Sequence, residues 1–440
     1  MNNKGVLLFF RRAVNFGFYS LALFSPLSIS ATQAALSIIL LSWIALMITE
    51  RRFIFAKTSL NYPFLAYLCA VIIAAIFGVD FIHSAKSINK LWIILTFFSV
   101  LTFIPHITPC EESLRSRLCA GFIEDIKMVR RLVYILLVVT SIVSIYGVLQ
   151  HIFPGIDIAR PEGRKVVQWA EGGVASTGFF DHHMTYGGYL LLVFSLSFSL
   201  FLSNIKERGL LIFYVLSTIL IAGGLISSMA RNTWVGSLFA IFFIILFRIK
   251  NRIILSFVAG LIILSVVTYT LVPVTYLFQS SILNRFKSIF DVSKNVERLY
   301  IWKSTIDMII EHPLTGVGMD NYSKAIHDYR DKYNHEFGPG TDAHAHNNIL
   351  TQAAEHGMLG LTAFLWIWVG FFKEGIRIYR DLRFKLSTQH SALSTSIVLG
   401  GLGAIVGFHI AGMFENNFGD AEVATMVWFI MGLVFLMKKI

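Results

Sequence analysis

Residues 184–203 read MTYGGYLLLVFSLSFSLFLS and contain no Asp, Glu, Lys or Arg. A helix of about 20 residues is about 30 Å long, which matches the hydrocarbon core of a bilayer. This stretch is therefore long and apolar enough to cross a membrane. The whole chain shares its character: 55% of the 440 residues are hydrophobic, 14% are charged, and the mean hydropathy is +0.68. Such a composition excludes an ordinary soluble globular protein.

Similar apolar stretches recur along the chain, and we predict about twelve transmembrane helices. The first is followed at once by another apolar stretch rather than by a small-residue cleavage site, so we expect it to be retained. The predicted fold class is all-α, a polytopic transmembrane helix bundle with a large helical periplasmic loop subdomain. The predicted spans are roughly 13–29, 31–49, 60–79, 88–107, 132–153, 184–203, 209–228, 233–248, 253–275, 357–373, 393–413 and 421–437.

The basic residues give the orientation of the bundle. If the N-terminus is cytoplasmic, most of the 37 Lys and Arg residues fall in cytoplasmic connections and most acidic residues fall outside. This is the positive-inside pattern of membrane proteins. The formal net charge of +11 therefore reflects topology rather than a nucleic-acid surface. We expect both termini to be cytoplasmic, membrane lipids to surround the protein, and no nucleic acid to bind.

This topology divides the chain into four parts. Residues 1–153 hold the first five transmembrane helices, and residues 154–275 hold a central region with arginine-bearing outer loops. Residues 276–356 form the periplasmic loop subdomain, and residues 357–440 hold the last three spans. In the third part, apolar residues recur at helical spacing over 296–310, which predicts an amphipathic helix. A Gly-rich turn and a polar helix to about Tyr333 follow it.

A few arginines occur on the outer side, where this topology otherwise avoids positive charge. The planar guanidinium matches the oxygens of a phosphate better than an ammonium does, so these arginines favour an anionic diphosphate ligand. Anchoring at the membrane interface is the alternative for the one in the short turn 228–232. The four arginines are Arg160, Arg164, Arg231 and Arg298.

His346 is the leading candidate for a catalytic residue. It ends a polar outer loop, and good helix-forming sequence follows at 349–355. We expect His346 in the first helical turn, where unpaired N–H groups disfavour a positive charge and keep the ring neutral. A neutral imidazole can serve as a general base. His344, two positions earlier, is expected either roughly opposite around a helix turn or in the preceding loop.

Two clusters could instead suggest a metal site, since imidazole and carboxylate are ligands of zinc or manganese. Neither cluster has the spacing of a known zinc motif, and adjacent histidines on a helix cannot both face one ion. We therefore expect no metal and no other cofactor. The clusters are Asp181, His182 and His183, and Asp342, His344 and His346.

Several motifs together resemble the signature of the bacterial O-antigen ligase and O-antigen polymerase superfamily. The resemblance covers about residues 155–360. The motifs are His346-Asn347 followed by Gly357-x-x-Gly360, Arg231 in Ser-x-x-Arg-x-x-x-x-Gly, Glu297-Arg298-x-x-x-Trp302, the turn from His312-Pro313 to Gly318, and Gly178-Phe179-Phe180-Asp181-His182.

The resemblance implies a membrane-embedded glycosyltransferase of the GT-C type in the bacterial inner membrane, with a periplasmic active site. Its donor would be a glycan on undecaprenyl diphosphate, and the reaction would be inverting and independent of metal. His346 would then be the base. Arg231 and Arg298 would hold the diphosphate with help from Arg160 and Arg164, and His182 and Asn347 would be accessory residues.

Three functions remain to be distinguished. O-antigen ligases of this superfamily move the glycan to a sugar of lipid A–core, and this is the preferred interpretation. Polymerases instead join it to another lipid-linked repeat unit of O-antigen or exopolysaccharide. A transporter of lipid-linked glycans would need charges along a path inside the bundle, whereas the predicted spans are almost free of charges.

Overall fold

The computed structural model describes residues 3–104, 114–158, 167–168, 174–203, 207–249, 296–330, 343–384 and 389–438. Nearly all regular structure in these ranges is helical. Two short antiparallel strands, β1 (Val167–Gln168) and β2 (Val174–Ala175), form the sheet found there. The predicted all-α fold is therefore confirmed. The predicted span 253–275 lies outside the described residues.

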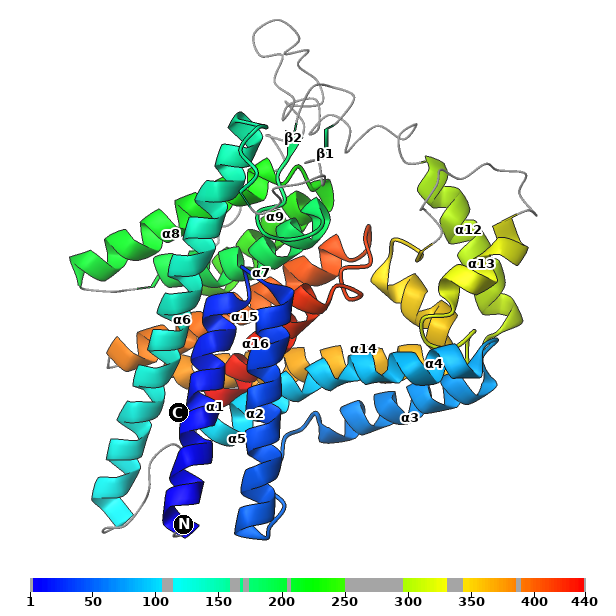
Figure 1. Ribbon diagram of the computed structural model, residues 1–440. Helices are drawn as coiled ribbons and strands as arrows, with labels where there is room; N and C mark the ends of the chain where they lie inside the picture. Colours follow the sequence, from blue (N-terminus) through cyan, green and yellow to red (C-terminus); the bar gives the residue numbers. More distant parts are fainter. Residues whose placement is uncertain are drawn as a thin grey trace, which may run out of the picture.

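The helices follow the chain in three groups (Figure 1). The first group is α1 (Asn3–Phe24), α2 (Ile29–Glu50), α3 (Asn61–Phe77), α4 (Phe81–Ser87), the 3₁₀ helix η1 (Ile88–Ile94), α5 (Leu95–Phe103) and α6 (Leu114–Ile152). The second is α7 (His183–Phe201), α8 (Arg208–Ser227) and α9 (Arg231–Arg248). The third is α12 (Val296–Glu311), α13 (Tyr322–Arg330), α14 (Asn348–Phe384), α15 (Gln389–Ala411) and α16 (Ala421–Leu436).

These helices fit a multi-pass membrane protein. Within the described ranges, nine helical segments are long and apolar enough to cross a membrane, and α3 and α16 are shorter apolar helices. Each span predicted in these ranges overlaps one of these segments, although the bounds differ, as for 13–29 and the segment Gly5–Phe24. The match is good because the length of an apolar run is a local property of the sequence.

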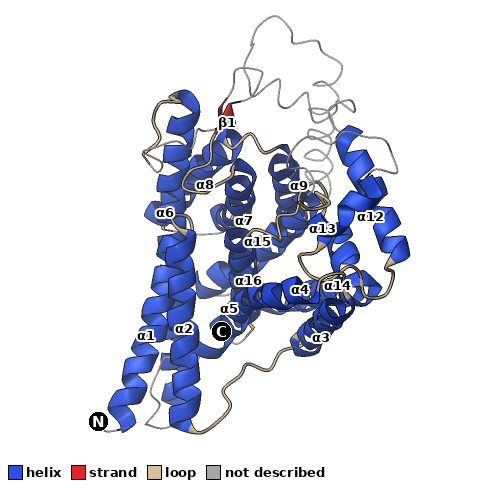
Figure 2. Ribbon diagram, turned by 45° about the vertical axis from the view of Figure 1, so that its right-hand side comes forward, coloured by secondary structure: helices blue, strands red, loops and turns tan. Residues whose placement is uncertain are grey.

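The centre of the bundle is formed by α7, α15 and α16, which other helices surround (Figures 1 and 2). Tyr186 and Tyr189 of α7 are fully buried. Close approach of α9 and α15 depends on small residues: a Cβ at Gly236 would lie 2.5 Å from the carbonyl oxygen of Gly407. Such small-residue contacts are typical of packed membrane helices.

One end of the bundle gathers basic side chains against helix ends. Arg248 at the end of α9 donates to the carbonyl oxygen of Leu202 at 3.2 Å. Arg383 of α14 donates to that of Phe247, also at 3.2 Å. Cations near helix C-termini are favourable because the last carbonyl groups carry partial negative charge. At the opposite end of the bundle, α7, α9, α14 and α16 begin.

Helix α14 is broken at Gly357, whose φ of 61° and ψ of −168° are not helical. The turn after α12 fills the break. Val317 N–H donates to the carbonyl oxygen of Ala354 at 2.9 Å, and Met358 N–H donates to that of Pro313 at 2.8 Å. The backbone groups freed by the break are thus paired. The turn from His312-Pro313 to Gly318 and the Gly357-x-x-Gly360 motif therefore meet in one joint, which we call the α14 joint.

In the described residues 296–330, α12 and α13 are the two helices that the sequence predicts for this part of the chain. Both views place them together beside the start of α14 (Figures 1 and 2). Met308, Tyr322 and Ala345 belong to a small core of their own. Helix α13 is described as far as Arg330, and residues 331–342, which include the predicted helix end at about Tyr333, lie outside the described ranges.

Candidate active site

His346 lies just before α14 and not in its first turn, so this part of the sequence prediction was wrong. The helix begins at Asn348, and His346 has a left-handed φ of 48°. Asn347 caps the helix, because its Oδ1 accepts from the N–H groups of Ile349 at 2.9 Å and Leu350 at 3.0 Å. Asparagine is among the preferred residues at this position. The cap directs the helix away from His346 and leaves its ring beside the helix start.

Asn347 and Asn348 hold the loop between α15 and α16 next to His346. Asn347 Nδ2 donates to the carbonyl oxygen of Met413 at 3.1 Å, and Asn348 N–H donates to that of Gly412 at 2.7 Å. Asn348 Oδ1 accepts from the N–H of Phe418 at 3.2 Å. A Cβ at Gly412 would lie on the Asn348 side chain, so only glycine permits this approach.

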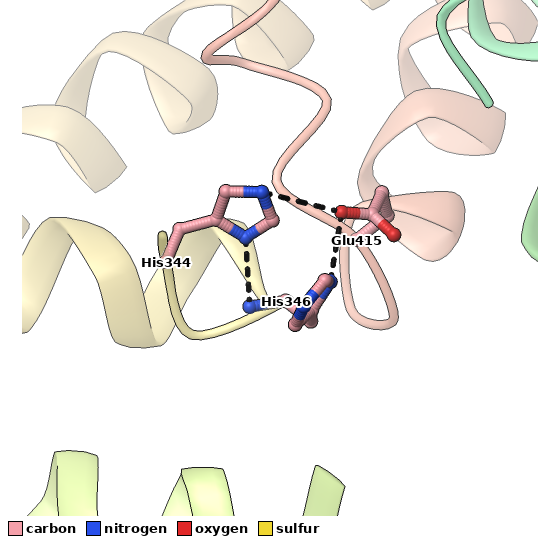
Figure 3. Close-up of side chains that lie close together, drawn as sticks. All are labelled: His344, His346 and Glu415. Carbon is pink, nitrogen blue, oxygen red and sulfur yellow. Dashed lines mark hydrogen bonds and ion pairs between the residues drawn. The ribbon is translucent and has the colours of Figure 1, made fainter. Parts of the chain in front are cut away.

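Glu415 lies in this loop and contacts both histidines, and it was not among the site residues predicted from the sequence. Its Oε1 lies 3.0 Å from His346 Nδ1 and 3.6 Å from His344 Nε2 (Figure 3). Its Oε2 lies 3.7 Å from a guanidinium nitrogen of Arg298. The side chain is only 8% exposed. We call Glu415, His344, His346 and Arg298 the Glu415 cluster. The only sequence signal was a carboxylate in a short outer connection.

Glu415 is ionised despite its burial. Burial alone raises the pKa of its carboxyl group. The hydrogen bond to His346, the charges that His346 and His344 carry when protonated, and the charge of Arg298 outweigh that effect and lower the pKa to about 2. A carboxylate that is ionised only accepts hydrogen bonds. His346 Nδ1 must therefore carry a proton and donate a hydrogen bond to Glu415.

His344 lies in the loop before α14, which is one of the two positions expected from the sequence, and its ring faces the cluster. Its ring centroid lies 4.4 Å from that of His346. Its Nδ1 accepts the backbone N–H of His346 at 3.2 Å. Burial lowers the pKa of His344 to about 4, although Glu415 opposes this shift, so the ring is neutral near pH 7. With Nδ1 an acceptor, the proton of the neutral ring is on Nε2, which faces Glu415.

These assignments leave one nitrogen of His346 with a lone pair that can accept a proton. In the neutral ring of His346, Nδ1–H is engaged with Glu415, so Nε2 carries the lone pair. A carboxylate on the far nitrogen orients the ring and stabilises the imidazolium that forms when the base takes a proton. From the sequence, the field at the helix end was expected to keep the ring of His346 neutral. In the structure, the hydrogen bond from Nδ1 to Glu415 fixes the position of the proton instead.

The same three side chains could hold a divalent metal ion, since one ligand atom from each of His344, His346 and Glu415 lies within 4.8 Å of the others. Ligation would need lone pairs on His344 Nε2 and His346 Nδ1. The hydrogen bonds place protons on both atoms. Metal binding would therefore require both rings to exchange tautomers and His344 to release the backbone N–H of His346.

His182 stands beside the cluster and caps the start of α7. Its Nδ1 accepts from the N–H of Met184 at 3.3 Å, and the charges of Glu415 and His346 act on it. Burial lowers the pKa of His182. The preceding loop is fixed by Gln150, whose Oε1 accepts from the N–H of Gly178 at 2.9 Å.

The other predicted site residues are placed less directly. Arg231 is half-buried and is the first residue of α9 rather than part of the preceding turn. It follows Ser228, whose carbonyl oxygen lies 3.0 Å from His183 Nδ1, so Arg231 stands at the same end of the bundle as His182. Arg160, Arg164 and Asp342 lie outside the described residues.

Helix α12 contributes to the site from the other side. Trp302 Nε1 donates to the carbonyl oxygen of Ala345 at 3.0 Å, which fixes the loop that carries both histidines. Arg298 lies one helical turn earlier on α12, and its side chain is 24% exposed. The Arg298-x-x-x-Trp302 pattern thus places a cation and a loop anchor on one face of the helix.

Comparison with known proteins gives one family match. Residues 216–365 match the O-antigen ligase family. This is the superfamily whose signature the sequence resembles, so the resemblance is confirmed. The matched segment contains Arg231, Arg298, His346 and the α14 joint, whereas His182 and Glu415 lie outside it.

One curated relative extends the comparison. The Rickettsia conorii protein named "Putative polysaccharide ligase RC0486" is 28% identical over 144 residues. The match covers 32% of this chain and 32% of that protein. Both findings support a membrane enzyme of the ligase or polymerase type.

Proposed function

We propose that this protein is an O-antigen ligase-type glycosyltransferase. It moves a glycan from undecaprenyl diphosphate to a sugar of lipid A–core at the periplasmic face of the bacterial inner membrane. The amphiphilic donor fits this location, because its prenyl tail belongs in lipid, its diphosphate at the interface and its glycan in water. The observation that carries the proposal is the contact of 3.0 Å between His346 Nδ1 and the buried carboxylate of Glu415.

In the proposed reaction, His346 Nε2 takes the proton of the acceptor hydroxyl as its oxygen attacks the anomeric carbon. The new glycosidic bond forms while the bond between the anomeric carbon and the diphosphate oxygen breaks. A single displacement of this kind inverts the anomeric centre. Glu415 stabilises the positive charge that then develops on His346.

The electron pair of the broken bond leaves with the diphosphate. Arg298 and Arg231 stabilise the charge that gathers there, which is the role that a divalent ion plays in many other transferases. Arg160 and Arg164 are proposed to assist from the connection before α7. His182 and Asn347 act as accessory residues, and Asn347 does so by holding the Glu415 loop against the base.

The test is glycan transfer in vitro with purified protein and lipid-linked donor. We expect His346→Ala to lower the rate by about 10²–10⁴-fold, which is the usual loss without a general base. Donor binding should be retained. His344→Ala should cost less, because His344 only supports the base, and EDTA should leave the rate unchanged. If EDTA stops transfer and zinc restores it, the cluster is a metal centre and this mechanism is wrong.

A polymerase would use the same chemistry with another lipid-linked repeat unit as acceptor. Deletion of the gene separates the two functions on a gel of surface polysaccharide. Loss of lipid A-linked chains with accumulation of long lipid-linked polymer indicates a ligase. Chains limited to a single repeat unit indicate a polymerase.

A further inference from the structure

Arg298 already has an anionic partner in this structure, and that partner also serves His346. Glu415 uses Oε1 for the histidines and for the backbone N–H of Asn416, which lies at 3.1 Å. Its Oε2 is buried and, among the described residues, accepts no hydrogen bond. Arg298 stands 3.7 Å from this oxygen, beyond the length of a good hydrogen bond. The ion pair is therefore a loose contact.

We propose that Glu415 is an exchangeable counterion of Arg298. When a donor binds, Arg298 moves from Glu415 to the diphosphate, and the negative charge of Glu415 then acts on His346. This inference rests on the proposed function, because it concerns the same donor and the same base. It assigns Glu415 two effects of opposite sign. The carboxylate weakens donor binding, because it holds Arg298, and it speeds transfer, because it stabilises the imidazolium of His346.

The exchange is favourable for Arg298. A guanidinium can form two parallel, short hydrogen bonds to a phosphate, and such contacts are stronger than an ion pair without hydrogen bonds. Arg298 is partly exposed, so it can turn toward a ligand at the mouth of the bundle without leaving α12. While it stays with Glu415, part of the carboxylate charge is neutralised.

Release of Arg298 changes the environment of the base. The groups whose charges act at the Glu415 cluster are His182, His344, His346, Arg298 and the nearby Asp420. Arg298 is the permanent cation among these groups. Once it binds the diphosphate, Glu415 has no fixed positive neighbour within the group. Its full charge then stabilises the imidazolium of His346, so the base becomes stronger only when a donor is bound.

The isosteric variant Glu415→Gln separates the two effects. It can still accept the His346 Nδ1–H bond but carries no charge, so Arg298 is free for the ligand. We expect undecaprenyl diphosphate, used as the binding probe, to bind about 5- to 150-fold more tightly, a range typical of coupling between two linked interactions of one site. KM should decrease because the donor binds more tightly. The turnover rate kcat with lipid-linked donor should also decrease, because the base is weaker without the charge of Glu415. A residue that merely supported the fold would weaken binding.

Two further variants control the experiment. Glu422→Gln removes another carboxylate near the start of α16, outside the cluster, and should change neither quantity. In the double variant Arg298→Gln with Glu415→Gln, the gain in binding should disappear. If Glu415→Gln does not yield folded protein, Glu415→Asp replaces it. The shorter side chain withdraws from Arg298 and should show the same gain in smaller measure.

The inference is overturned if Glu415→Gln binds undecaprenyl diphosphate as the wild type does, or less tightly. It is also overturned if the double variant keeps the gain. Failure of the proposed function looks different. The wild-type protein would then show no transfer from the lipid-linked donor, whereas the binding measurements would remain interpretable by themselves.

Discussion

At the scale of single residues, the site depends on two histidines with different tasks. His346 has a left-handed backbone, a conformation that costs free energy for a residue with a Cβ and persists when its surroundings enforce it. Those surroundings are the Asn347 cap, the Glu415 carboxylate and the acceptor atom of His344. His344 is a half-buried neutral group that supports the loop. Because its pKa is lowered, its contribution to stability depends on pH.

The pH dependence of stability tests the role of His344. Burial lowers its pKa to about 4 from an ordinary value of 6.5, so the folded state binds fewer protons than the unfolded state between these values. Stability should therefore fall as the pH drops from 6.5 to 4, with no such loss above 6.5. The measurement is the melting temperature of purified protein at pH 7 and at about pH 4.5.

The matched variant is His344→Gln, whose side-chain oxygen can accept the N–H of His346 but does not titrate. It should lose less of its melting temperature over the same pH interval. Equal losses in both proteins would mean that other groups govern acid destabilisation and that His344 is not kept neutral by the fold.

At the scale of elements, the α14 joint connects the candidate site to the bundle. The first part of α14 follows the His346 loop, and the second part crosses toward the basic end. Between them, the turn after α12 inserts its backbone and pairs with the broken helix. Asn321 strengthens the joint, because its side chain donates to the carbonyl oxygens of Val317 at 3.0 Å and Asp80 at 3.1 Å. The joint therefore fixes α12, and with it Arg298, relative to His346.

Gly357→Ala tests the joint. At φ 61° and ψ −168° the backbone is in a region that is essentially restricted to glycine. A Cβ would also meet the carbonyl carbon of Leu314. We expect a loss of at least 1–3 kcal/mol of stability, on the order of the cost of a strained backbone. The assay is thermal unfolding of purified protein.

Gly209→Ala is the control, because this helical glycine of α8 has open space around its Cβ position. It should be neutral or slightly stabilising, since alanine favours a helix over glycine by roughly 0.5–1 kcal/mol. A Gly357→Ala protein that melts like the wild type would show that α14 is continuous in the native protein.

At the scale of the whole molecule, the two ends of the bundle differ in chemistry. One end holds Arg248, Arg383 and Lys438 against helix C-termini or buried acids, as in the pair of 2.6 Å between Lys438 and Glu374. The opposite end holds the Glu415 cluster. This separation is what a cytoplasmic face and a periplasmic active site would require.

Cysteine labelling in intact cells checks this orientation. The native Cys69, Cys110 and Cys119 are first replaced by serine, and single cysteines are introduced at Asp328 on α13 and at Asp381 near the end of α14. Both positions are exposed. A membrane-impermeant maleimide should label position 328 in intact cells and position 381 only after permeabilisation. The reverse pattern would place the Glu415 cluster in the cytoplasm and remove it from a periplasmic glycan.

The sequence by itself determined the helical membrane fold, the approximate position of each span in the described residues and the resemblance to the O-antigen ligase family. These features are local, since an apolar run of the right length and the charges beside it act wherever the chain folds. Only the tertiary structure decided which side chains meet. Glu415 lies 69 positions from His346 and reaches it because Asn347 and Asn348 bind the loop between α15 and α16. Such a contact depends on how helices pack, and no local pattern in the chain encodes that.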